Sequence, residues 1–426
     1  MSAVITISIL SMLLFISIAV NKKLFTYTNI FILEWLIIVL FSSIKYDNYY
    51  EIKPITFIVI TIGVLAFFCG SIIYKTLLVN KRFVIGRARN YTNNLDFSNK
   101  VIKLFLFIHI LSSIYFTLKS AYFLMNGYSF SYLRNIYQGY DANALYITNQ
   151  FEEVFRNWVA LPLEIVLPTI AVSLYISKRK INHFYFFLLI DQILYLFYSQ
   201  NKGALAFIVI YLFIVATTFW KKLPTIVRRN VKRIIIIGSV TVIVLFAIRN
   251  SYNNNYTLLE TLYKYVCGCV NMLNEKIIMA ESNHWMTFGM SSIFGFITLI
   301  EVVLGVTPIG KGEFYSYVLN IQMDKEIFIR IGPSRWMNAY CTWFYDFFLD
   351  FRFIGVVLGG IIFGIVSEIG YKKLIKSNGN VYDMSISLNI AIMIVMSMVR
   401  WQFSSANFAM AFVYFLLMKK MSRRVG

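Results

Sequence analysis

Residues 234–248 read IIIIGSVTVIVLFAI, and this apolar run stops at Arg249. From there to Arg352 the chain carries eight basic and nine acidic side chains, although only 14% of all its residues are charged. This polar stretch closes with GPSRWMNAYCTWFYDFFLDFRFIG at 332–355, which leads directly into another apolar run. The pattern predicts a large polar loop, residues 250–352, between two membrane-spanning helices.

The composition of the 426-residue chain indicates a protein solvated mostly by lipid. Hydrophobic residues make up 59% of it, and its mean hydropathy is +0.67. A soluble protein of this size needs more charge on its surface. Repeated apolar runs of roughly 17 to 22 residues are each long enough to cross a hydrocarbon core of about 30 Å. Because a chain in lipid must satisfy its own backbone hydrogen bonds, these runs are expected to be helices.

The apolar runs predict an all-α polytopic membrane protein with about eleven spans, within a range of ten to twelve. The first run lacks a basic leader and a small-residue cleavage site, so it is expected to remain as a helix. No linker or internal repeat divides the chain, which indicates one membrane domain over residues 1–426. The predicted spans are 2–20, 27–44, 54–74, 101–124, 153–177, 183–199, 203–220, 234–249, 353–371, 384–400 and 404–419.

Lysine and arginine predict the orientation of these spans. More than half of the 40 basic residues fall in alternate short loops, which assigns these loops to the cytoplasm. The N-terminus is then outside and the C-terminus cytoplasmic. The same bias accounts for the net charge of +20 without nucleic acid, because the chain has no nucleic-acid motif. The basic loops contain Lys22-Lys23, Lys75 to Lys103, Lys178 to Lys180, Lys221 to Arg233, Lys372 to Lys376 and Lys419 to Arg424.

The outer face is predicted to receive a middle loop, 125–152, and the large loop, 250–352. Within the large loop, residues 289–305 (GMSSIFGFITLIEVVLG) form an apolar segment that could be a twelfth span. A crossing there would spoil the alternation of the last three spans, and Gly/Ser-rich breaks and Glu301 also argue against it. We therefore expect a re-entrant or interfacial helix.

Four basic residues lie at the outer ends of helices, where the positive-inside rule gives no reason for them: Arg134, Lys202, Arg249 and Arg335. Arginine is permanently charged, and its planar fork holds phosphate oxygens in a bidentate way. Converging near an outer membrane surface, such groups would suit a lipid-linked pyrophosphate. Each could instead snorkel to the interface or pair with a nearby acid.

Acidic and imidazole side chains of the large loop are candidates for acid–base chemistry. Asp346 and Asp350 are four residues apart in FYDFFLDF, so a helix would place both on one face. Asp350 is predicted to orient or deprotonate an acceptor hydroxyl, whereas Asp346 is expected to pair with Arg335 or Arg352. His284 is the second candidate base, although a lone histidine is more often structural.

Three acids lie within predicted spans: Glu34, Glu164 and Asp191. Intramembrane acids are functional candidates because their burial is costly, and a transporter would use them to couple ions. These three look scattered along the sequence without basic partners in neighbouring spans, so they argue only weakly for a transporter. No metal site is expected, because Cys267-Gly-Cys269 is not a zinc spacing.

A resemblance to a known family is carried by residues 338–342 (NAYCT) and 350–355 (DFRFIG), which precede three helical glycines. This order resembles the Wzy-type polymerases of bacterial O-antigen and capsule repeat units. Their pattern is roughly N-x-Y-T, then D-F-G-x-x-G with a glycine-rich helix after it. The three glycines are Gly359, Gly360 and Gly364.

Two further stretches look like parts of the same family. GYSFSYLRNIY at 127–137 looks like its middle outer loop, and 201–203 (NKG) looks like its small-residue–Arg–Gly element. Two positions depart from the family pattern. Arg352 stands where glycine is usual, and Lys202 stands where arginine is usual, which keeps the charge but loses the planar fork.

The resemblance implies a fold similar to the GT-C class and a glycosyltransferase reaction at the outer face of the bacterial inner membrane. A growing glycan on undecaprenyl pyrophosphate would be joined to one lipid-linked repeat unit of O-antigen or capsule (lipopolysaccharide or capsular polysaccharide). No cofactor is expected, and the good leaving group makes the reaction metal-independent. A separate chain-length regulator is an expected partner.

The residue roles that follow divide into three groups. The leaving pyrophosphate would be held by Arg134, Lys202, Arg249 and Arg335, which stabilises the charge that develops in the transition state. Asp350, or else His284, would act on the acceptor hydroxyl. The glycan would contact Asn338, Tyr340 and Tyr345, because tyrosine offers an apolar face and a hydroxyl to sugar rings.

Two alternatives remain open. A flippase or transporter of the same lipid-linked repeat unit should have balanced halves, an even number of helices and charged residues along a central cavity. An O-antigen ligase would transfer the finished glycan to another lipid. The concentration of polar residues in one outer loop favours an enzyme, and the motifs near the C-terminus favour a polymerase over a ligase.

Overall fold

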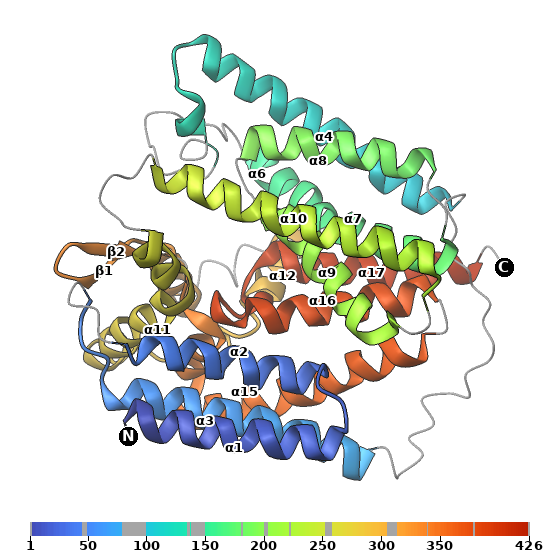
Figure 1. Cartoon of the computed structure of the whole chain (residues 1–426). Coiled ribbons are helices and arrows are strands. Elements are labelled where there is room, and N and C mark those ends of the chain that lie inside the picture. The colour runs from blue at the N-terminus through green and yellow to red at the C-terminus, as the bar shows by residue number, and fades with distance from the viewer. Residues whose placement is uncertain are drawn as a thin grey trace. The chain divides into compact units, whose positions relative to one another are not determined.

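The fold divides into two compact units, which are described separately (Figure 1). Unit 1 comprises Met1–Arg89, Phe246–Lys373 and Ile390–Ala409, and unit 2 comprises Asn90–Leu245, Leu374–Asn389 and Met410–Gly426. The single membrane domain over residues 1–426 stays a prediction. The computed structural model describes residues 2–44, 49–78, 99–133, 137, 150–179, 182–199, 203–220, 223–251, 258–304, 313–338, 340–377 and 380–424.

The described part of the chain is a helical membrane protein. Six of its helices are long and apolar enough to cross a membrane: Ala3–Asn21, Pro54–Thr76, Lys100–Met125, Phe151–Lys178, Thr342–Lys376 and Val381–Met398. Shorter apolar helices occupy four more of the predicted spans: Tyr27–Ser42, His183–Ser199, Ala206–Phe219 and Ala406–Lys419. The eleventh predicted span, 234–249, lies within α10 (Thr225–Ser251). The total of eleven crossings and the GT-C likeness stay predictions.

Unit 1 is built on an antiparallel set of apolar helices with a polar cap formed by the large loop. The apolar helices are α1 (Ala3–Asn21), α2 (Tyr27–Ser42), α3 (Pro54–Ile73, continued by a π-helical turn at Tyr74–Leu78) and most of α15 (Thr342–Lys376). The cap consists of α11 (Leu258–Ser282), α12 (Phe294–Leu304), α14 (Glu313–Asp324), β1 (Ile329–Gly332) and β2 (Arg335–Met337). Short 3₁₀ turns at Met396–Met398 and Gln402–Ser404 complete the unit.

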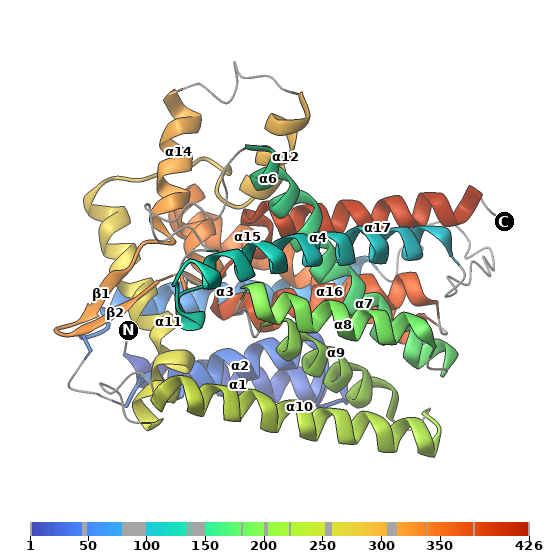
Figure 2. The same cartoon turned by 90° about the horizontal axis from the view of Figure 1, so that it is seen from above.

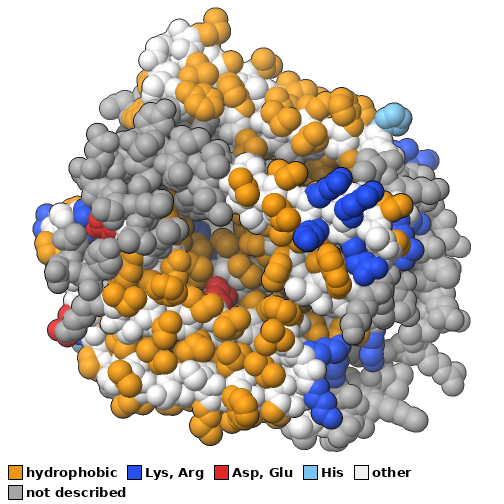
Figure 3. Space-filling view, viewed as in Figure 1, with side chains coloured by type: hydrophobic (Ala, Val, Ile, Leu, Met, Phe, Trp, Pro, Cys, Tyr) orange, Lys and Arg blue, Asp and Glu red, His pale blue; other side chains and the backbone are white. Residues whose placement is uncertain are grey.

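Helix α1 shows how local sequence forms these elements. The hydroxyl of Ser2 accepts a hydrogen bond from the amide of Ile5 and caps the amino end. The helix ends at Lys22, whose φ of 52° places it in the left-handed region that stops a helix. Large apolar side chains between these ends stay exposed, with Phe15 at 76%. Figure 3 shows hydrophobic side chains over the same helices, as expected for a lipid-facing surface.

Helix α15 is two helices joined by a sharp break. Phe351 and Arg352 have non-helical backbone angles, with φ of +55° at Arg352. The indole of Trp343 lies 5.6 Å from the ring of Phe363, although twenty residues of a continuous helix would separate them by about 30 Å. The first arm, 342–350, therefore folds back on the second, 353–376. The predicted span 353–371 begins where this second arm begins.

The second arm of α15 packs closely on α3 through glycines. A Cβ on Gly364 would lie 2.1 Å from the carbonyl oxygen of Phe67, and one on Gly70 would lie 2.1 Å from that of Ile361. No side chain fits between backbones at this separation. Small residues allow such close helix packing in membranes, where the hydrophobic effect does not hold helices together.

Basic side chains gather at one end of the apolar helices of unit 1. The amine of Lys75 pairs with buried Glu368 at 2.8 Å, and the hydroxyl of Thr28 donates to the same carboxylate at 2.7 Å. Lys372 lies over the ring of Tyr74, 4.6 Å from its centroid. Lys75, Lys372 and the carboxyl end of α1 thus share one end of the unit. This is the end that the positive-inside rule assigns to the cytoplasm.

The polar cap lies at the opposite end of the same helices, near the N-terminus. In Figure 2, α11 runs across the direction of α1 and α2. The side-chain oxygen of Asn274 in α11 accepts hydrogen bonds from the amide of Lys53 and the hydroxyl of Thr56, at 2.7 and 2.9 Å. The amide of Tyr50 donates to the carbonyl of Ile331 in β1 at 2.9 Å. These bonds fix the cap to the start of α3.

The apolar segment predicted at 289–305 forms a turn followed by α12. This described helix has 11 residues and is about 16 Å long, roughly half a hydrocarbon core. The re-entrant or interfacial helix expected from the sequence stays a prediction. Gly295 in α12 packs closely on the segment before α17, because a Cβ there would meet the carbonyl oxygen of Ser405 at 2.4 Å.

Unit 2 is a second helical bundle. Its helices are α4 (Lys100–Met125), α6 (Gln150–Phe155), α7 (Leu161–Lys178), α8 (His183–Ser199), α9 (Gly203–Phe219), most of α10, and parts of α16 (Val381–Val395) and α17 (Ala406–Arg424). A π-helical segment, Arg156–Ala160, joins α6 to α7, and a 3₁₀ turn occupies Phe130–Tyr132.

Prolines shape the start of α7. Pro162 cannot donate to the carbonyl of Trp158, which needs another partner. The hydroxyl of Tyr414 in α17 supplies it with a 2.7 Å hydrogen bond. Pro168 lies further along the same helix. The irregular backbone is thus buried in protein, where it can be tolerated at membrane depth.

Candidate functional site

The predicted site residues do not all fall within the described part of the chain. Arg134 and Lys202 lie outside it, and Arg249 lies in α10 with only its backbone described. His284 is exposed in the turn after α11, with a φ of 52°. The remaining five, Arg335, Asn338, Tyr340, Tyr345 and Asp350, are described and belong to unit 1.

Asp350 ends the first arm of α15 and holds the turn before α12. Its carboxylate is buried and accepts a hydrogen bond from the hydroxyl of Thr287 at 2.6 Å. It also accepts from the backbone amides of Ser291 and Ser292, at 2.9 and 3.1 Å. A carboxylate with three donors around it is well placed to fix this turn. These contacts favour a positioning role over direct contact with an acceptor hydroxyl.

Asp346 lies one turn earlier on the same face, as the four-residue spacing predicts. Its carboxylate is fully buried and pairs with the amine of Lys325, not with either arginine expected from the sequence. The hydroxyl of Ser291 donates to the same oxygen at 2.8 Å. Gln322 joins the network by donating to Ser291 at 2.7 Å. The other carboxylate oxygen, Oδ2, is buried without a hydrogen-bond partner.

The tripeptide Asp324-Lys325-Glu326 connects three separate elements through ion pairs. Asp324 receives the amine of Lys276 in α11 at 2.7 Å, and Lys325 pairs with Asp346 in α15. Glu326 receives both guanidinium nitrogens of Arg400 at 2.8 and 3.3 Å. Lys276 is fully buried, so its amine depends on these acceptors. The tripeptide thereby joins α11, α15 and the segment between α16 and α17.

The hairpin carries the remaining predicted residues. Arg335 in β2 pairs with Glu260 of α11 at 2.5 Å, and both side chains are buried. The amide of Asn338 donates to the carbonyl of Glu326 at 3.3 Å. Tyr340 is half-buried, whereas Tyr345 is fully buried in the first arm of α15. The buried position of Tyr345 argues against its direct contact with a glycan.

The break in α15 brings Arg352 to this region. Its guanidinium donates to the carbonyl of Ala280 in α11 at 3.1 Å and lies over the ring of Phe348, 5.0 Å from the centroid. Its other terminal nitrogen, Nη1, is buried without a hydrogen-bond partner. Arg352 thus links the break to the polar cap.

Sequence reasoning missed Lys276, Lys325 and Arg400. Arg400 sits at the outer end of the predicted span 384–400, so the rule that selected Arg335 would also have selected it. A signal for Lys325 is also visible, since Asp-Lys-Glu is a run of three charges in a charge-poor chain. Lys276 gives no comparable signal, because its burial depends on the packing of α11.

A second polar group lies within the apolar helices of unit 2. Nδ1 of His109 in α4 lies 2.6 Å from Oδ2 of Asp191 in α8, and Nε2 lies 3.5 Å from Oε2 of Glu164 in α7. One ligand atom from each residue lies within 4.8 Å of the others. Two of the three intramembrane acids are therefore not scattered, because the histidine brings them together. Glu34, the third, is half-buried in α2 of unit 1, and its buried carboxylate oxygens have no hydrogen-bond partner.

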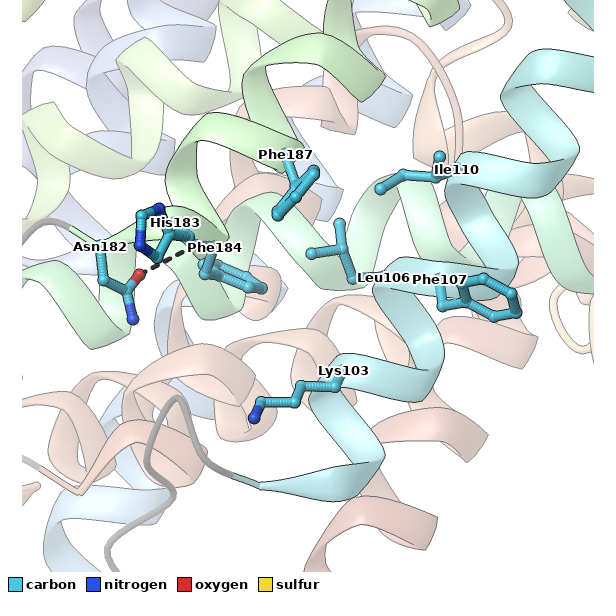
Figure 4. A pocket seen from close by; sticks show the side chains of 8 residues that line it. All are labelled: Lys103, Leu106, Phe107, Ile110, Asn182, His183, Phe184 and Phe187. Atoms are coloured by element: carbon cyan, nitrogen blue, oxygen red, sulfur yellow. Dashed lines mark hydrogen bonds between the residues drawn. The ribbon is translucent and has the colours of Figure 1, made fainter.

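A groove of about 540 Å³ lies between α4 and α8 (Figure 4). Leu106, Phe107 and Phe187 form apolar parts of its wall, with the amine of Lys103 at one end. Asn182, at the same end, accepts a 3.1 Å hydrogen bond from the amide of Phe184 and so caps α8. The groove has the apolar walls and single charged end that suit a lipid chain.

No family model, curated protein or solved structure matches this chain. The likeness to repeat-unit polymerases accordingly stays a resemblance carried by the motifs at 338–342 and 350–355.

Proposed function

We propose that this chain is a membrane glycosyltransferase that polymerises lipid-linked oligosaccharide repeat units of O-antigen or capsule. An acceptor hydroxyl oxygen attacks the anomeric carbon of the donor glycan and forms the new glycosidic bond. The bond from that carbon to the pyrophosphate breaks, and its electron pair leaves with undecaprenyl pyrophosphate. The hydroxyl proton passes to a base or to the leaving phosphate.

The observation that carries the proposal is that residues of the polar cap contact α15 at its first arm and at its break. The motif residues at 338–342 and 350–355 flank the first arm, whose acids meet Lys325 and the turn at Ser291. At the break, Arg352 has φ +55°, a conformation that glycine adopts readily. The family that the chain resembles has glycine at this position, which supports the resemblance.

The proposed orientation puts the polar cap on the outer face of the bacterial inner membrane. It is supported by the separation of charge in unit 1, where Lys75 and Lys372 lie at one end and the cap at the other. In this orientation the N-terminus is outside and the C-terminus is cytoplasmic. The cap would then meet substrates whose lipid tails lie in the outer leaflet.

The residue roles follow from charge and position. Arg335, with Arg134, Lys202 and Arg249, would hold the leaving pyrophosphate and stabilise its developing charge. Arg335 is paired with Glu260, so a phosphate would have to compete with this carboxylate. Exposed His284 is free to approach an acceptor, whereas Asp350 would position the turn before α12. Asn338 and Tyr340 remain the candidates for glycan contact.

Deletion of the gene, followed by analysis of surface glycan, tests this function. A polymerase predicts surface glycan with a single repeat unit, whereas complete loss of surface glycan would contradict it. Complementation with Arg335→Ala and Arg249→Ala should fail to restore long chains at normal protein levels. Arg330→Ala is the matched control, because Arg330 is an exposed neighbour in β1 that stacks on Trp336, 5.1 Å from its ring centroid. Long chains in both test variants would overturn the proposed pyrophosphate site.

A second candidate is a transporter or flippase of the same lipid-linked repeat unit. The group formed by His109, Asp191 and Glu164 favours it, because ionisable residues at membrane depth are typical of ion-coupled transport. This candidate predicts no surface glycan at all in the deletion strain. A ligase predicts the same loss, but undecaprenyl-linked long chains should then accumulate inside the envelope. The three readings therefore give different glycan patterns.

A further inference from the structure

The His109 group is built from three helices of unit 2 that pack on one another. His109 lies on α4, Glu164 on α7 and Asp191 on α8. The side chains of His109 and Asp191 are fully buried, and that of Glu164 is nearly so. We propose that His109 and Glu164 bind a divalent metal ion of the zinc class, with Asp191 orienting the histidine.

The orientation of His109 is that of a metal ligand. Asp191 accepts from Nδ1 at 2.6 Å, and the hydroxyl of Ser113 donates to the other oxygen of Asp191 at 2.7 Å. A proton on Nδ1 leaves the lone pair on Nε2, which faces Glu164. Metal-binding histidines usually donate their second nitrogen to a carboxylate in this way, which fixes the ring and raises its basicity.

The separation between His109 and Glu164 fits an ion better than a hydrogen bond. Nε2 and Oε2 lie 3.5 Å apart, longer than a usual hydrogen bond between nitrogen and oxygen. Two ligands at about 2.0–2.2 Å from a tetrahedral zinc ion are separated by roughly 3.3–3.5 Å. The observed distance matches the separation of two ligands on one ion.

The same group of side chains has further nitrogen and oxygen atoms that could bind a metal ion. Nε2 of His109, Oε1 of Glu164 and Oε1 of Gln192 are buried without hydrogen-bond partners. Gln192 contacts Glu164 directly, with its amide nitrogen donating to Oε2 at 3.0 Å. These groups can supply the oxygen ligands that complete a four-coordinate site.

Charge balance points the same way. With a neutral histidine, Asp191 and Glu164 bring two negative charges into an apolar bundle, where unpaired charge is costly. Among the described residues, no lysine or arginine pairs with either carboxylate, and a divalent cation would neutralise both. The site lies in unit 2 and contains none of the residues proposed for the glycosyltransferase, so it does not depend on that proposed function.

The test is the metal content of the full-length protein. The chain is purified in detergent through a tag without histidine, incubated with zinc, dialysed against metal-free buffer and analysed by mass spectrometry of the elements. We expect about one zinc per chain in the unmodified protein, and less than about a tenth in His109→Ala and Glu164→Gln. Glu34→Gln is the matched control, because it removes another intramembrane acid whose carboxylate oxygens are buried and should keep the zinc.

Two further measurements separate binding from folding. Zinc should raise the unfolding temperature of the unmodified protein and of Glu34→Gln, because it binds the folded state alone. It should not raise that of Glu164→Gln. Asp191→Asn should bind zinc about 10–100-fold more weakly without losing it, as expected for a residue that orients a ligand. A metal-free unmodified protein, or equal zinc in all variants, would overturn the proposal.

Discussion

The hydroxyl of Thr287 donates a 2.6 Å hydrogen bond to the carboxylate of Asp350, which lies 63 residues later in the chain. This bond joins the turn before α12 to the last residue of the first arm of α15. Together with the amides of Ser291 and Ser292, it satisfies the buried carboxylate of Asp350, which the sequence suggested would act on an acceptor hydroxyl. Removing this hydrogen bond tests whether Asp350 positions the turn before α12 or acts directly in catalysis.

Thr287→Val should lower the free energy of unfolding by about 1–3 kcal/mol, because one donor to a buried carboxylate is lost. Asp350→Asn should be more destabilising, since its amide nitrogen would face the amides of Ser291 or Ser292. Thermal unfolding in detergent measures both. Exposed Glu313→Gln is the control and should stay within about 0.5 kcal/mol of the parent. If Asp350→Asn were stable but made no polymer, Asp350 would have a direct chemical role.

Lys325 and Asp346 should behave as a coupled buried pair. Lys325→Met or Asp346→Leu alone leaves one buried charge without its partner, which costs about 3–5 kcal/mol. The double variant removes both charges and should be more stable than either single variant. Unfolding of the four proteins gives the coupling energy. If the double variant lost as much free energy of unfolding as the two single variants lose together, the pair would not be coupled.

Arg352→Gly should be more stable than Arg352→Ala. Both variants lose the hydrogen bond to the carbonyl of Ala280 and the contact with Phe348. Only alanine keeps the strain of this backbone conformation (φ +55°, ψ −136°), which costs a residue with a Cβ about 1–3 kcal/mol. A comparison of the two unfolding temperatures isolates this strain. Equal stability would mean that the break relaxes in the variants.

The thiol of Cys341 should be unreactive in the folded protein between pH 7 and 9. Its pKa is raised to about 12, mainly because the thiol is buried; Lys276 and Lys325 lower the pKa, and the carboxylates of Asp346 and Glu326 raise it. A raised pKa keeps the thiol protonated, so at pH 8 roughly one in ten thousand carries the reactive thiolate.

Iodoacetamide labelling followed by peptide mass spectrometry measures the reactivity of Cys341. Labelling should require denaturant, whereas a cysteine introduced as Ser282→Cys, at an exposed position, should label in the folded protein. Rapid labelling of native Cys341 near pH 8 would contradict its burial.

The proposed orientation predicts which side of the membrane a reporter protein reaches when it is fused to the chain or inserted into a loop. A fluorescent protein at the C-terminus should be bright, because it folds in the cytoplasm. Alkaline phosphatase inserted at exposed Asn283 should be active, because this turn is proposed to lie outside. The same enzyme inserted at Lys23 should be inactive and serves as the control. Activity at Lys23 with none at Asn283 would reverse the orientation.

Hydropathy was enough to locate most of the apolar helices. A helix that crosses lipid needs about twenty consecutive residues that are mostly apolar, and such a run is visible in the sequence. The predicted span 353–371 begins directly after the break at Phe351 and Arg352, since charge and polarity change sharply at Asp350 and Arg352. The spacing of Asp346 and Asp350 correctly placed both acids on one helical face. All of these are local features of the sequence.

The partners of those acids depended on tertiary structure. Lys325 reaches Asp346 only because the first arm folds back and α14 ends beside it, and no spacing in the sequence encodes that meeting. His109, Glu164 and Asp191 likewise lie on three helices whose packing alone brings their side chains together. The burial and ion pairing of a side chain depend on residues that are distant in the sequence and meet only in the folded protein. Insertion of a helix into the membrane depends on the hydropathy of consecutive residues.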